Sequence, residues 1–111
     1  MQIGFRDAKL QRLFNDHQSL QAKFGPALAS RIASRMGLLK AAPRLSLVPG
    51  QPPILLALAN GDLAEFTVNL SPEKKLRFRA SNPAVRKGAL LDLEAVTEIE
   101  VSGVEESQHE S

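Results

Sequence analysis

The chain has 111 residues and no cysteine, which predicts one domain and excludes disulfides and thiolate chemistry. Its longest apolar run, residues 54–59, is far shorter than the roughly 20 residues of a membrane span, and its opening residues lack the apolar core of a signal peptide. We therefore expect a soluble cytoplasmic protein with no contact to a membrane.

The charge is unevenly distributed, although the net value is only +2. Residues 1–44 carry eight basic and two acidic residues, whereas residues 89–111 carry seven acidic residues and no basic one. A basic body suggests an anionic partner, with nucleic acid the commonest kind. The alternative is that the two ends of the chain neutralise each other.

The first forty residues predict a strand followed by two antiparallel helices. Residues 1–6 alternate as a strand with Ile3 and Phe5 on one face, and Asp7 is suited to cap the helix that follows. Apolar residues at helical spacing begin at Leu10, and the pattern can continue to Phe24. Gly25 and Pro26 then separate a second helix, whose apolar stripe is Leu28, Ile32, Met36 and Leu39.

The second half of the chain predicts a run of strands. A proline-rich loop over residues 42–53 precedes a candidate buried strand at 54–59, and Asn60-Gly61-Asp62 is typical of a tight hairpin turn. Three further segments then alternate between apolar and polar residues, at residues 65–70, 75–80 and 96–101.

This order predicts an α+β fold in which the N-terminal strand and helical hairpin pack on one face of a mostly antiparallel sheet. We expect one domain over residues 1–101 and a polar, flexible tail over residues 102–111.

The segment KKLRFRA, residues 74–80, places Lys75, Arg77 and Arg79 on one face of a strand. Guanidinium groups bind phosphate through a planar fork of N–H donors, so this face suits an RNA backbone or a phosphorane-like transition state. The alternative is a solvated strand face whose cations are neutralised by Glu98 and Glu100 of a neighbouring strand.

Other kinds of site find little support. The two histidines, His17 and His109, have no carboxylate at a metal-ligand spacing, and we expect His17 to be a half-buried histidine on the apolar face of its helix. The chain contains neither a nucleophile elbow nor a glycine-rich phosphate loop. We therefore predict no metal and no cofactor.

The chain resembles the RelE/ParE superfamily of toxins from type II toxin–antitoxin systems, and within it the HigB-like "killer protein" subgroup. The resemblance rests on the order of the elements and on the stretches NGDLAEFTVNL, KLRFR and NPAVRKGALLDLEAVTEIEV, and it covers roughly residues 1–101. It implies a ribosome-dependent mRNA endonuclease, which cleaves RNA by attack of the 2′-hydroxyl on the adjacent phosphate without a metal.

The resemblance also implies site residues and partners. Lys75 and Arg79 match the positions that hold the phosphate, and His109 stands in for the histidine near the end of the family's chains. Arg77 shares their face, and we expect Lys74, Arg31 and Arg35 to bind RNA as well. The implied partners are the ribosome, mRNA and a helix-turn-helix antitoxin encoded by the adjacent gene.

Two departures from the family leave other functions open. Asn60 stands where the family has a lysine before its Gly-Asp, and the chain contains no tyrosine. A ParE-like toxin that inhibits gyrase without nuclease activity, and a catalytically degenerate binding protein of the RelE fold, are therefore alternatives.

Overall fold

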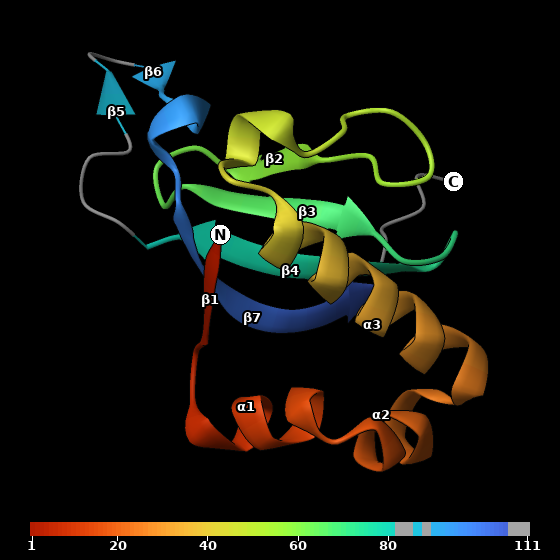
Figure 1. Ribbon diagram of the computed structural model, residues 1–111. Helices are drawn as coiled ribbons and strands as arrows, with labels where there is room; N and C mark the ends of the chain where they lie inside the picture. The colour runs from red at the N-terminus through yellow and green to blue at the C-terminus, as the bar shows by residue number, and fades with distance from the viewer. Residues whose placement is uncertain (82–85, 88–89, 107–111) are drawn as a thin grey trace.

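A five-stranded mixed sheet with α-helices beside it forms this protein in the computed structural model (Figure 1). The structure describes residues 1–81, 86–87 and 90–106, and for residues 86, 87 and 90 only the backbone. In order across the sheet, the strands are β1 Gln2–Phe5, β7 Glu98–Glu106, β4 Lys74–Ala80, β3 Glu65–Asn69 and β2 Ala57–Asn60. Among the described strand pairs of this sheet, only β1–β7 is parallel, so the predicted α+β class and mostly antiparallel sheet are confirmed.

The helical part precedes most of the sheet in the chain. Its elements are α1 Ala8–Asn15, α2 His17–Phe24 and α3 Pro26–Ala41. Short 3-10 turns, η1 Leu45–Leu47 and η2 Leu93–Ala95, and a small strand pair, β5 Arg86–Lys87 with β6 Leu90–Leu91, complete the described elements. Within the described ranges, no helix has the length and apolar character that crossing a membrane requires.

Two aspartates set the helix boundaries. Asp7 caps α1, because its Oδ1 accepts a hydrogen bond from the Leu10 backbone N–H at 2.8 Å. The apolar pattern that could continue from Leu10 to Phe24 is interrupted at Asp16, which ends α1 and caps α2 by accepting from the Gln18 backbone N–H at 3.2 Å. The Asp16 carboxylate also accepts from the Ser19 hydroxyl at 2.7 Å. The predicted break at Gly25 is confirmed, because α2 ends at Phe24 and α3 begins at Pro26. Gly25 has a φ of 86°, which glycine adopts readily.

Because Asp7 and Asp16 cap helices as carboxylates, we expect the folded state to become less stable in acid. The Leu10 N–H lowers the pKa of Asp7 below its ordinary 3.8, and the Ser19 hydroxyl lowers that of Asp16. Carboxyls with a lower pKa in the folded state stabilise it above the unfolded pKa of about 4 and lose this contribution as the pH falls through the folded values. We expect the urea midpoint to decrease from pH 5 to pH 3, and less so in the double variant Asp7→Asn, Asp16→Asn. An identical pH dependence in that variant would show that the caps are not responsible.

The core lies between the sheet and α3, which crosses one of its faces (Figure 1). The inward residues predicted for β3, β4 and β7 are buried in the structure, and Phe66 and Phe78 stack at 6.1 Å between ring centroids. Ile32 and Leu39 of α3 are fully buried against this layer. The alternating pattern of the three strands therefore identifies the face that packs against the helices.

The predicted strand at residues 54–59 is wrong in its burial and its bounds. Ile54 is buried, but β2 begins at Ala57, forms the sheet edge and is largely exposed. An edge strand needs no continuous apolar burial, and the leucines of this segment gave a misleading signal. The hairpin at Asn60 is confirmed, although the positive φ falls on Ala64, and the Asn60 side chain shapes the turn by accepting from the Asp62 N–H at 3.0 Å.

The last strand, β7, extends five residues beyond the predicted end at Val101. A bulge at Ser102 allows this, because Phe78 pairs with Val101 while Arg77 pairs with Gly103. Gly103 has a φ of 138°, a value that residues other than glycine rarely adopt. The extra residue directs Val104 toward the core and Glu105 to the opposite face. Residues 107–111 of the predicted tail lie outside the described residues.

Candidate functional site

Three of the four cations of β4, Lys75, Arg77 and Arg79, lie together on the face of the sheet opposite the core, here called the charged face. Leu76, Phe78 and Ala80 are buried, so the alternate residues Lys75, Arg77 and Arg79 point the other way. The register places these cations opposite Asn69, Thr67 and Glu65 of β3 and opposite Glu105, Gly103 and Glu100 of β7. The predicted alignment of the cations is thus present, with carboxylates on both neighbouring strands.

Those carboxylates bind the arginines. Arg77 donates from Nε to Glu65 Oε2 at 2.8 Å and from Nη1 to Glu105 Oε2 at 2.9 Å, and its Nη2 also binds Glu65. Arg79 donates from Nε to Glu100 Oε2 at 2.7 Å. Hydrogen bonds to Glu105 and Glu65 raise the pKa of Arg77, and the bond to Glu100 raises that of Arg79. Both guanidinium groups are therefore held as cations in an ion-pair network.

A shallow depression of about 610 Å³ lies over this network. Residues of β3, β4 and β7 line it, together with Arg6, which follows β1. The Arg77 and Glu65 side chains are 31% and 18% exposed, whereas Arg79 is 49% exposed. Ion pairs with that much exposure contribute little to stability, about 0–1 kcal/mol, so the outer pair with Arg79 can exchange partners easily.

The two lysines at the start of β4 differ. Lys75 is partly buried on the charged face and has no ion pair among the described residues. Lys74 is not on the charged face, because it has the same parity along β4 as the buried residues Leu76 and Phe78. Its Nζ binds Glu106 Oε1 at 2.8 Å, which lowers the pKa of Glu106. Of the two predicted lysines, the structure therefore brings only Lys75 beside the arginines.

Arg31 and Arg35 lie on α3, on the other side of the sheet. Arg31 Nη1 donates to the Leu70 carbonyl at 3.2 Å, and Arg35 Nε donates to the Asn69 carbonyl at 2.8 Å. These contacts join α3 to the end of β3. They give both arginines a structural role, and the structure does not bring them together with Lys75, Arg77 and Arg79.

Among the described residues, no histidine lies on the charged face. His17 is exposed, contrary to the expected half-buried position, and its Nε2 lies 3.1 Å from Gln21 Nε2. It begins α2 after the interruption at Asp16, so its side chain leaves the apolar stripe. His109 lies outside the described residues. Within the described ranges, no cluster of three or more metal-binding side chains occurs.

Sequence reasoning missed Glu65, Glu105 and Arg6 as members of the site. Glu65 could have been found, because a hairpin between β3 and β4 with Phe66 opposite Phe78 also places Glu65 opposite Arg79. Glu105 could not, because without the bulge at Ser102 the alternation directs it toward the core. Of the two expected acidic neighbours, Glu100 binds Arg79, whereas Glu98 lies opposite Gln2 of β1.

The arrangement combines two kinds of chemistry on one surface. The guanidinium and ammonium groups can bind a phosphate and neutralise charge that develops on it. The adjacent carboxylates can accept a proton once the cations have turned to such a ligand.

Comparison of the chain with protein-family models, with curated proteins and with solved structures gave no match.

Proposed function

We propose that this protein is a toxin of the RelE/ParE type that binds mRNA on the charged face of its sheet and cleaves it on the ribosome. The observation that supports this most strongly is the placement of Lys75, Arg77 and Arg79 on one exposed face beside three carboxylates. Residues two apart on a strand are about 6–7 Å apart, which is close to the separation of adjacent phosphates in single-stranded RNA.

Phosphate binding requires the arginines to exchange carboxylate for phosphate. Within the part of the chain that the structure describes, Arg79 donates to one carboxylate, that of Glu100, and it is the more exposed of the two arginines. A surface pair of this kind is worth about 0–1 kcal/mol, so a phosphate with two accessible oxygens can replace it. Arg77, with Glu65 and Glu105 on either side, remains as a second positive charge below the phosphate.

Cleavage then needs one proton acceptor and one proton donor. The 2′-oxygen forms a bond to phosphorus while the bond from phosphorus to the 5′-oxygen breaks, leaving a 2′,3′-cyclic phosphate. Glu100, released by Arg79, accepts the proton of the 2′-hydroxyl. The Lys75 ammonium donates a proton to the departing 5′-oxygen, a role that His109 is able to share.

Expression in a bacterial host tests this function against the gyrase alternative. Pulse labelling with radioactive methionine and thymidine is expected to show protein synthesis falling first, with DNA synthesis maintained. The control variant Arg12→Ala removes one positive charge from α1 and is expected to leave the fall in protein synthesis unchanged. A DNA-damage response with undiminished protein synthesis would instead indicate the ParE-like mode of action.

The ion-pair network also favours a second candidate, a binding protein of the same fold without nuclease activity. Arg77 uses Nε, Nη1 and Nη2 on Glu65 and Glu105, so three of its five N–H donors already bind carboxylates. Such a protein would inhibit translation while the mRNA stays intact. Primer extension on mRNA from the same cultures separates this outcome from cleavage.

A further inference from the structure

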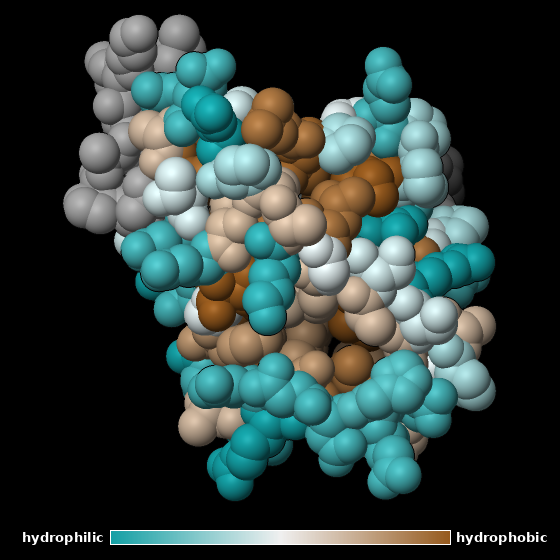
Figure 2. All heavy atoms as spheres, in the orientation of Figure 1, coloured by the Kyte–Doolittle hydropathy of each residue, from teal (hydrophilic) through white to brown (hydrophobic). Residues whose placement is uncertain are grey.

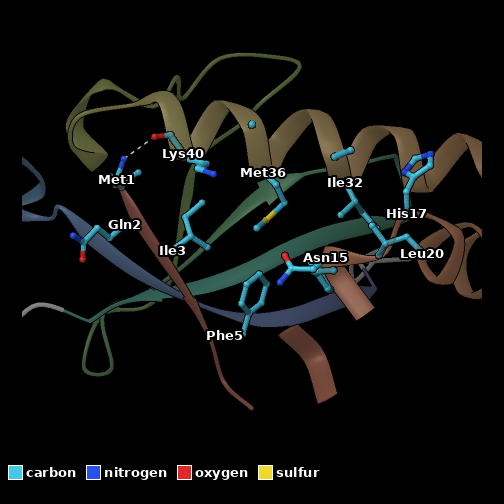
Figure 3. Close-up of a pocket in the computed structure, with 13 residues that line it drawn as sticks. Met1, Gln2, Ile3, Phe5, Asn15, His17, Leu20, Ile32, Met36 and Lys40 are labelled. Carbon is cyan, nitrogen blue, oxygen red and sulfur yellow. Dashed lines mark hydrogen bonds between the residues drawn. The ribbon is translucent and has the colours of Figure 1, made fainter. Parts of the chain in front are cut away.

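The apolar surface of the described residues has two parts that differ in exposure. One is a groove of about 710 Å³ between β1, the α1–α2 pair and α3 (Figure 3). Its large apolar side chains are buried or half-buried, among them Phe5, Phe14 and Ile32. The other part consists of the exposed large apolar side chains, which are Leu47, Leu55, Leu58 and Leu63. All four lie between residues 47 and 63, and none of them lines the groove.

The segment that carries most of these leucines has no charge. Residues 45–61 contain no Asp, Glu, Lys or Arg, whereas these four types make up 23% of the whole chain. In Figure 2 hydrophobic atoms are visible at the top of the view, in the part where β2 lies in Figure 1. A group of exposed apolar side chains without charges marks a surface that contacts another molecule.

The strand in this segment, β2, forms an open edge of the sheet. It is the last strand in the order, and within the described ranges it pairs with β3 alone. Ala57, Leu58 and Ala59 are exposed. Natural edge strands commonly carry charged side chains or proline, which prevent pairing with another chain. Residues 54–60, ILLALAN, contain neither, so the outer side of β2 can accept a further strand.

The register across the sheet indicates which side chain belongs beside β2. Val101, Phe78 and Phe66 lie opposite one another on β7, β4 and β3, and all three are buried. Leu58 is the next residue in this row, opposite Phe66, but it is 57% exposed. Residues directly opposite each other point to the same face of a sheet, so the row belongs to the core layer. A leucine on an added strand would continue the row and cover Leu58.

We propose that two copies of this chain pair through β2 in antiparallel orientation, with Leu58 of each copy opposite Leu58 of the other. The same strand then serves both copies, and because it is neutral, the pairing brings no like charges together there. A charged partner, such as nucleic acid, finds no opposite charge on this edge. This inference does not depend on the RNA chemistry proposed for the charged face.

The pairing also fixes how the two charged faces are arranged. The two-fold axis that relates the strands of a symmetric antiparallel pair is perpendicular to the sheet. The two five-stranded sheets therefore join into one sheet with both charged faces on the same side.

The expected dimer is weak, because β2 has only four residues and a bulge lies between Leu58 and Asn60. We expect half-association at roughly 10–100 µM, as for small, transient interfaces. Sedimentation velocity of the full-length protein from about 2 to 500 µM measures it. The expected result is a monomer at the lowest concentration and mostly dimer at the highest.

A charge at the centre of the paired strands is expected to prevent association. Leu58→Lys places two like charges opposite each other, and we expect association at least about tenfold weaker. The variant stays folded, because the Leu58 side chain is largely exposed. Ser34→Lys adds the same charge at an exposed position of α3 and is expected to associate like wild type.

The register can be tested directly, because the chain contains no cysteine. Opposite residues of an antiparallel pair have Cα atoms about 4.5–5.5 Å apart, within the range of about 4.4–6.8 Å found for disulfides. Under mild oxidation we expect Leu58→Cys to form a disulfide-linked dimer at least about tenfold faster than Leu63→Cys. Leu63 is about as exposed as Leu58, but it lies in the turn beyond β2.

Three results would each overturn the proposal. The first is a wild-type protein that stays monomeric over the whole concentration range. The second is association of Leu58→Lys as strong as that of Ser34→Lys. The third is equally fast cross-linking of Leu58→Cys and Leu63→Cys.

Discussion

Replacing Arg79 with alanine is expected to lower ribosome-dependent mRNA cleavage by about 10²–10³-fold, the effect of removing one donor that stabilises transition-state charge. Arg79 is the more exposed arginine of the charged face, and its guanidinium donates to the Glu100 carboxylate. Loss of this surface pair changes stability by about 0–1 kcal/mol, so the variant stays folded. The measurement is the rate of cleavage of a defined mRNA on purified ribosomes.

Matched variants separate a site effect from a charge effect. Lys75→Ala is expected to lower the rate in the same way, and Arg79→Lys to restore little, because lysine lacks the planar fork. Arg12→Ala removes one positive charge from α1 and is expected to cleave like wild type. Undiminished cleavage by the double variant Lys75→Ala, Arg79→Ala would remove the charged face from the mechanism.

Replacing Phe78 with alanine is expected to lower the free energy of unfolding by about 3–5 kcal/mol, the usual effect of truncating a buried phenylalanine. Phe78 is 0% exposed, stacks on Phe66 and pairs with Val101 across β4 and β7. Because domains of this kind have about 5–15 kcal/mol of stability in total, the loss is a large fraction of the whole. Urea denaturation at pH 7 measures it.

Leu63→Ala provides the comparison for that prediction. Leu63 is 58% exposed, in the turn between β2 and β3, so its truncation creates no cavity. We expect a change within about 0.5 kcal/mol, as for most surface substitutions. Equal losses for Phe78→Ala and Leu63→Ala would show that β4 is not at the centre of the core.

Much of the fold follows from local rules that can be applied directly to the sequence. Asp7 caps a helix, Gly25 ends one, and alternation assigns Phe66 and Phe78 to the core. These features depend on residues close together in the chain or on a period of two. The same alternation correctly predicts that Lys75, Arg77 and Arg79 share one face of β4.

The rest of the site depends on pairing between strands far apart in the chain. One inserted residue at Ser102 decides that Glu105 binds Arg77 and that Val104 enters the core. Periodicity cannot reveal such an insertion, because it shifts every later residue of the strand to the other face. The groove is equally hidden, since its lining comes from β1, α1–α2 and α3, and Asp16 divides the first two helices within one apolar pattern.

The most direct test of the proposed function is the chemistry of the cleaved RNA. Purified protein is incubated with ribosomes carrying a defined mRNA, and the ends of the fragments are determined by mass spectrometry. Attack by the 2′-hydroxyl predicts fragments that end in a 2′,3′-cyclic phosphate or its hydrolysis product, a 3′-phosphate, and that are lost with Lys75→Ala, Arg79→Ala. Intact mRNA on ribosomes exposed to the wild-type protein, or fragments that end in a 3′-hydroxyl, would contradict the account.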